Sequence, residues 1–179
     1  MSRADQHRWG VFLPLFSIIL VLDIVTKRWA LGALQHGVTV FPYGDALPLT
    51  LAFNRGVAFS LHLGDASRVV FTIFTIAVVL VLLHLLRTTP EGHFLRIFSL
   101  TLVISGAIGN LIDRVRWERG VVDFLGPYDL GFMLWPIFNI ADMGVTCGAV
   151  LLSIALWRED VAERDAAALV AEEPATRSS

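Results

Sequence analysis

The sequence predicts an all-α integral membrane protein that has four transmembrane helices and a small β-containing cap on one membrane surface. Of its 179 residues, 55% are hydrophobic and only 17% are charged, whereas soluble domains carry about 25% charged residues. The mean hydropathy of +0.67 agrees with this. Four apolar windows approach the roughly 20 helical residues that cross a bilayer core of about 30 Å, and a soluble chain of this length could not bury them all.

The four predicted spans form one transmembrane domain over residues 1–157. Trp9, Trp135 and Trp157 stand at span ends, where indole rings favour the membrane interface. Pro136 would occupy the first turn of the last helix, where its missing N–H group is harmless. The spans cover about 9–25, 69–86, 94–112 and 135–157.

The connections between the spans differ in length. Residues 28–68 form a long loop in which two strand-like runs, Val38–Phe41 and Leu47–Phe53, are separated by Pro42, Gly44 and Asp45, so we expect a small structured cap there. Residues 114–134 form a second long loop. The tail at 158–179 is acidic and rich in alanine, and is expected to extend the last helix and then fray.

Net charge and cysteine content say little about the partners or the membrane orientation of the protein. The net charge of −2 gives no reason to expect nucleic acid as a partner, and the 14 Lys and Arg residues divide evenly between the two sides, so the positive-inside rule does not choose an orientation. Cys147 is the only cysteine, so no intrachain disulfide can form. Its apolar surroundings predict a small buried hydrophobic residue.

Polar residues gather at the span ends that share one membrane face. In an up-and-down arrangement this face receives the end of the first span, the first long loop, the end of the third span, the second loop and the start of the fourth span. The polar residues at these places are Asp23, Asn54, Arg55, Asn110, Asp113, Arg114, Asp123, Asn139 and Asp142.

Two of the aspartates are the best candidates for chemistry. If the fourth helix begins near Trp135, Asp142 lies roughly 10 Å along it, where a carboxylate is costly unless it is paired or protonated. Asp142 has no Lys or Arg within a turn of its own span. Brought close to Asp123, it would share a proton with it, so that one carboxyl group could activate water while the other polarises a carbonyl group.

Other interpretations stay open on these residues alone. Asp23, Asp123 and Asp142 could form a proton relay or ion site of a transporter, or the chain could be a structural membrane subunit with its long loops as a partner surface. Asp113 could pair with Arg114, and Asn110 and Asn139 could join helices through hydrogen bonds. The pair Ser60 and His62 lacks a third orienting group. The sequence contains no H-E-x-x-H metal site, and no cofactor is implied.

Five motifs, in order, resemble the lipoprotein signal peptidase family, also called signal peptidase II, over about 9–157. They are D-I-V-T-K at Asp23–Lys27, N-R-G-V-A-F-S at Asn54–Ser60, G-A-I-G-N-L-I-D-R at Gly106–Arg114, V-V-D-F at Val121–Phe124 and F-N-I-A-D at Phe138–Asp142. The sequence departs from the family pattern at Met143, where serine is common, and carries Arg55 and Val57 in the second motif.

The resemblance implies a monomeric aspartic endopeptidase of the bacterial inner membrane. Its substrates would be prolipoproteins carrying a diacylglyceryl-cysteine, embedded in membrane lipid, and cleavage would fall just before that cysteine. Asp123 and Asp142 would be the catalytic pair, without a metal or another cofactor. The termini and the acidic tail would be cytoplasmic, and the site and the cap at 28–68 would face the periplasm. The residues implied to line the site are Asp23, Asn54, Asn110, Arg114 and Asn139.

Overall fold

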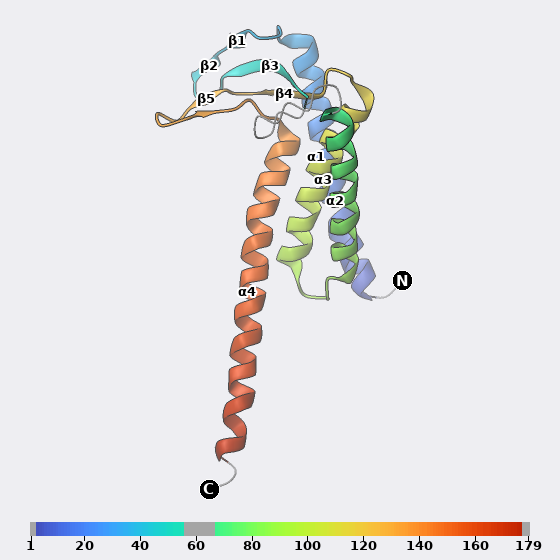
Figure 1. Ribbon diagram of the computed structural model, residues 1–179, viewed down its shortest axis with the longest axis vertical. Coiled ribbons are helices and arrows are strands. Elements are labelled where there is room, and N and C mark those ends of the chain that lie inside the picture. Colours follow the sequence, from blue (N-terminus) through green and yellow to red (C-terminus); the bar gives the residue numbers. More distant parts are fainter. Residues whose placement is uncertain (1–2, 56–66, 177–179) are drawn as a thin grey trace.

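Four long helices stand side by side beneath a small β cap in the computed structural model, which describes residues 3–55 and 67–176 (Figure 1). All four are long and apolar enough to cross a membrane, which confirms the predicted fold class. The first and last extend well past the apolar windows from which they were predicted. The helices are α1 (Arg3–Ala33), α2 (Ser67–Thr88), α3 (Phe94–Arg116) and α4 (Ile140–Thr176).

The β cap is built from both long loops. Its three-stranded antiparallel sheet has the order β1-β3-β4, and β5 pairs with β6 in a separate hairpin. The sequence predicted strands only in the first loop, and it placed turn residues where β2 lies. The strands are β1 (Thr39–Val40), β2 (Pro42–Asp45), β3 (Leu49–Asn54), β4 (Val121–Leu125), β5 (Tyr128–Asp129) and β6 (Leu134–Trp135).

Helix α4 begins at Ile140, so the predicted start near Trp135 is wrong. Trp135 belongs to β6, and Pro136 precedes the helix instead of occupying its first turn. The reason is a backbone bridge, because the N–H group of Phe138 donates to the carbonyl of Leu125 at 2.9 Å and the N–H group of Leu125 donates back at 2.8 Å. Because Phe138 is held in this extended pairing with β4, the helix begins two residues later, at Ile140.

Helix α3 is the most buried of the four and packs against α1, α2 and α4. Small residues permit its close contact with α4, where Gly144 and Gly148 lie four residues apart on one side of the helix. A β-carbon at Gly148 would lie 2.9 Å from the carbonyl oxygen of Ser99. Cys147, between these glycines, is exposed rather than buried as the sequence predicted.

The two ends of the molecule differ. The cap covers one end of the helices, while the N-terminus and the α2–α3 turn lie at the other, beyond which α4 continues (Figure 1). The helical extension of the tail is confirmed as far as Thr176. Val57, Ser60 and His62, with most of the second motif, fall in residues 56–66, outside the described part of the chain.

Candidate active site

Strand β4 carries Asp123 to the inner side of the cap. Successive side chains of a strand point to opposite faces. Val122 and Phe124 pack with Leu51 and Ala30 in one hydrophobic cluster, so Asp123 points to the other face. There it lies opposite Ala52 of β3 and is only 3% exposed. A carboxyl group is thereby buried at the junction of cap and helices.

Asp142 lies in the first turn of α4, not two turns deep as the sequence suggested. Asn139 precedes the helix as its N-cap, and its Oδ1 accepts a hydrogen bond from the Asp142 N–H group at 2.9 Å. In return, Asp142 Oδ2 accepts one from the Asn139 N–H group at 3.2 Å. This reciprocal capping box fixes the helix start, and half-buried Asp142 lies at the cap end of α4.

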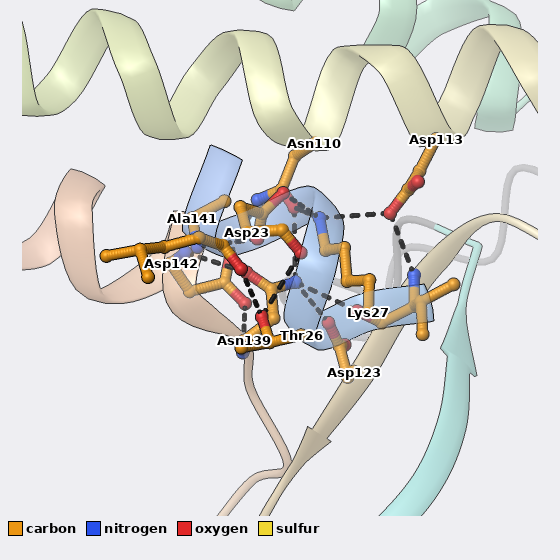
Figure 2. Close-up of polar contacts among 11 residues, drawn as sticks. Asp23, Thr26, Lys27, Asn110, Asp113, Asp123, Asn139, Ala141 and Asp142 are labelled. Atoms are coloured by element: carbon orange, nitrogen blue, oxygen red, sulfur yellow. Dashed lines mark hydrogen bonds and ion pairs between the residues drawn. The ribbon is translucent and has the colours of Figure 1, made fainter. Parts of the chain in front are cut away.

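Two asparagines join the aspartates from three elements (Figure 2). Asn139 Nδ2 donates to Asp123 Oδ1 at 2.6 Å. Asn110 Nδ2, from α3, donates to Asp142 Oδ1 at 2.7 Å. The two amides also contact each other, since Asn139 Nδ2 lies 3.1 Å from Asn110 Oδ1. The structure thus brings Asp123 and Asp142 to one network that Asn139 touches on both sides.

Lys27 anchors this network from α1, and the sequence analysis did not identify it as a site residue. Its buried Nζ lies 2.7 Å from Asp23 Oδ2 and 3.0 Å from Asp113 Oδ2, and it donates to Asn110 Oδ1 at 3.1 Å. The Lys27 ammonium is therefore surrounded by two carboxylate oxygens and one amide oxygen. Asp23 and Lys27 are four residues apart, a spacing that places them side by side on α1. Asp113, for which the sequence left a pair with Arg114 open, pairs with Lys27 instead.

Asp23 connects α1 directly to the start of α4. Its Oδ1 accepts a hydrogen bond from the Ala141 N–H group at 2.9 Å, so this carboxyl group satisfies one donor of the α4 N-terminus, where negative charge is favourable. Gly109 of α3 leaves the room for this contact, because a β-carbon there would lie 2.6 Å from Asp23 Oδ2.

Asn54 and Arg114 complete the predicted set of site residues. Asn54 ends β3, opposite Val121 of β4, and its side chain forms a hydrogen bond with Asp123. The Arg114 guanidinium interacts electrostatically with Asp142, Asp123 and Asp113, and its buried Nε has no hydrogen-bond partner among the described residues. Arg114 is therefore a cation beside the two aspartates that is left without a full set of partners.

Burial and charge shift the proton affinity of Asp123, which lies outside the membrane-spanning helices. Desolvation, and after it the charge of the neighbouring Asp142, raise its pKa from 3.8 to a net value of about 7. Hydrogen bonds from Asn139 and Asn54 and the charge of Lys27 oppose this rise in pKa. Near neutral pH, Asp123 therefore carries a proton much of the time, as expected for one member of a carboxyl pair.

The arrangement is suited to acid–base chemistry on a water molecule and a carbonyl group. A protonated carboxyl group and a second carboxyl group that accepts hydrogen bonds lie in one network, with a guanidinium beside them. Within the described residues, no group of three or more His, Cys, Asp or Glu side chains is placed to hold a metal ion.

Comparison with known proteins agrees with these features. The sequence profile of the family described as signal peptidase (SPase) II matches residues 15–158. A lipoprotein signal peptidase of Hydrogenovibrio crunogenus is 42% identical over 154 residues, covering 83% of this chain and 87% of the relative. The lipoprotein signal peptidase of Clostridium tetani is 39% identical over 141 residues, covering 79% and 88% of the two chains.

Solved structures show the same fold. A bacterial membrane enzyme determined by the in meso method at 1.9 Å resolution superposes with a TM-score of 0.74 at 29% identity, covering 82% of this chain and 92% of that one. A second such structure, at 2.3 Å resolution, gives a TM-score of 0.72 at 29% identity. The family profile spans most of the chain, and the chain therefore belongs to the signal peptidase II family.

Proposed function

We propose that this protein is an aspartic endopeptidase that removes the signal peptide from prolipoproteins, with Asp123 and Asp142 as its catalytic residues. One observation carries the proposal. Asn139 donates to Asp123 Oδ1 at 2.6 Å and caps Asp142 through its Oδ1 at 2.9 Å, so one buried amide holds both carboxyl groups at the membrane edge. The membership of the signal peptidase II family supplies the substrate class.

The roles of the two aspartates follow from their surroundings. Asp142 is partly exposed and accepts hydrogen bonds on both oxygens, so it is the carboxylate that takes a proton from the attacking water. Asp123, whose pKa is about 7, gives its proton to the scissile carbonyl group as the tetrahedral intermediate forms. Arg114 stabilises the negative charge that develops beside the pair. The proton held by Asp142 then passes to the leaving amine, the re-forming carbonyl group returns its proton to Asp123, and the peptide bond before the lipidated cysteine breaks.

The position of the pair fits a substrate that is itself held in the membrane. The bond cleaved would precede a diacylglyceryl-cysteine whose acyl chains stay in the bilayer, while the signal peptide lies among the spans. Binding both parts would place the carbonyl group at the first turn of α4, where orientation lowers the barrier. Asn54, Asn110 and Asn139 would hold the substrate backbone or the aspartates, and Asp23 would hold the start of α4.

We infer a bacterial inner-membrane orientation in which the cap faces the periplasm and both termini face the cytoplasm. The side that carries the cap is then the side to which prolipoproteins deliver their lipidated cysteine. We also propose that the protein acts as a monomer.

The proposal is tested with the purified full chain in detergent and a lipid-modified prolipoprotein. We expect cleavage just before the lipidated cysteine, and its loss in both Asp123→Asn and Asp142→Asn while thermal melting shows that each variant is folded. Asp129→Asn is the matched control, because Asp129 is exposed on β5 and accepts only a local hydrogen bond from Gly131. Full cleavage by either dyad variant would refute the assignment of the pair.

A further inference from the structure

A cavity of about 350 Å³ lies at the end of the molecule opposite the aspartate pair. It is open to the outside and is bordered by the α2–α3 turn, the start of α3 and one turn of α4, and its volume is within the range of small-ligand sites. Its walls combine apolar and basic groups. The lining residues are Gly92, His93, Phe94, Leu95, Arg96, Ala155, Arg158 and Glu159.

The charges around the cavity are not balanced. Glu159 is the only acidic lining residue, and both of its oxygens are engaged, with His93 Nδ1 at 2.6 Å and Arg96 Nη1 at 3.1 Å. Arg158 also lines the cavity and forms no ion pair within the described part of the chain. One guanidinium is thus left to attract an anion from outside the protein.

The depth of the cavity matches a lipid headgroup. At a rise of roughly 1.5 Å per residue, Arg158 lies about 24 Å along α4 from Asp142, which is close to the far boundary of the hydrocarbon core. The adjoining Trp157 is 67% exposed, as expected for an indole ring at the interface. Phe94, Leu95 and Ala155 give the cavity an apolar side on which glycerol and the first acyl carbons could pack.

From this combination we propose that the cavity binds the phosphate headgroup of an anionic phospholipid from the leaflet opposite the active site. Arg158 contacts the phosphate, and Arg96, held in place by Glu159, adds positive charge beside it. A guanidinium is well suited to phosphate because it presents several N–H donors in one plane. This site is separate from the proposed catalytic function and does not depend on it.

Native mass spectrometry of the full chain, released from detergent micelles, tests the proposal. We expect the wild type to retain phosphatidylglycerol in preference to phosphatidylcholine, and Arg158→Gln to weaken phosphatidylglycerol binding about fivefold, the effect of one basic residue near a lipid surface. The matched control is Arg164→Gln, because Arg164 is on the same helix, lies outside the cavity and pairs with Asp160 at 2.9 Å. This control should bind lipid as the wild type does.

Three outcomes would overturn the proposal. Equal retention of the two lipids by the wild type would show that the cavity does not select an anion. Equal losses in Arg158→Gln and Arg164→Gln would indicate general attraction to a basic helix. Thermal stabilisation by inorganic phosphate as large as that by phosphatidylglycerol would assign the cavity to a soluble anion. Thermal melting of each variant tests whether it is folded. Because Arg158 is exposed, we expect Arg158→Gln to melt as the wild type does.

Discussion

At the scale of single residues, the burial of Asp123 and its neighbouring carboxyl group together set the pKa of Asp123. Desolvation and the Asp142 charge raise its pKa from 3.8 to about 7. The asparagines that touch it donate hydrogen bonds that limit the rise without cancelling it. The Asp123 carboxyl group is therefore protonated below about pH 7 and ionised above it, so its titration falls near neutral pH.

The proposed mechanism predicts that activity falls as pH rises through about 7. Protonated Asp123 is the acid of the reaction, and raising the pH removes that proton. The value of kcat/KM, measured from about pH 5 to about pH 9 with the folded protein in one detergent, should decline on the alkaline side with an apparent pKa that belongs to the pair. A profile that stays level up to about pH 9 would contradict this role.

The raised pKa also makes a prediction for stability. The folded chain binds more protons than the unfolded chain between about pH 4 and about pH 7, so ionisation of Asp123 lowers the free energy of unfolding as pH rises through this window. Asp123→Asn keeps the shape and removes the charge. We expect it to raise Tm at about pH 8 and to change Tm little at about pH 4.

Thermal melts of the wild type and Asp123→Asn at the two pH values provide the measurement. Asp129→Asn serves as the control, since Asp129 is exposed and its substitution should leave Tm unchanged at both. A lower Tm for Asp123→Asn at the alkaline pH would show that the ionised carboxylate stabilises the fold.

At the scale of elements, the start of α4 is fixed by groups from outside the helix. Asp23 of α1 accepts from the Ala141 N–H group, and Asn139 forms the capping box with Asp142. Lys27 holds Asp23 in turn through a 2.7 Å ion pair. The direction of the Asp142 side chain therefore depends on how closely α1 and α3 approach the first turn of α4.

Gly109→Ala should disturb this approach. The new methyl group would meet Asp23 Oδ2 and would also lie 3.2 Å from Ala141 Cβ, so we expect a lower Tm and at least about tenfold slower cleavage through the displaced helix start. The control is Gly10→Ala, because Gly10 of α1 has nothing within 4 Å of its added carbon. That change should be neutral or stabilising by up to about 1 kcal/mol. Equal effects of the two substitutions would refute the packing explanation.

At the scale of the whole molecule, the helices form a compact group and α4 continues alone beyond it (Figure 1). Residues 160–169 of this extension are all exposed. In the cap, the central strand β3 pairs with β1 from the first long loop and with β4 from the second. The site thus lies where cap and helices meet, and the extension lies far from it.

Removal of residues 166–179 should leave both cleavage and Tm unchanged, because the described side chains of that segment are exposed. The measurement is cleavage of the lipid-modified substrate together with a thermal melt. Gly148→Leu is the contrasting variant, since even a β-carbon there would lie 2.7 Å from Val103 Cγ2 and 2.9 Å from Leu102 Cβ. It should lower Tm by several degrees. A large loss of activity in the truncated chain would assign the extension a role in catalysis.

The sequence by itself determined the four spans, the presence of a cap and the gathering of polar residues at one face, since apolar length and helix order are properties of the chain alone. Family motifs pointed to Asp123 and Asp142 as a pair. These inferences needed no knowledge of how distant segments contact each other.

Only the tertiary structure decided where α4 begins and how the site is held. The bridge between Phe138 and Leu125 keeps the chain extended past Pro136, so Asp142 is in the first turn of a helix that local pattern would start earlier. Asp113 likewise pairs with Lys27 rather than with its neighbour Arg114. Both results depend on contacts between residues far apart in the chain, and helix periodicity and local charge spacing carry no information about such contacts.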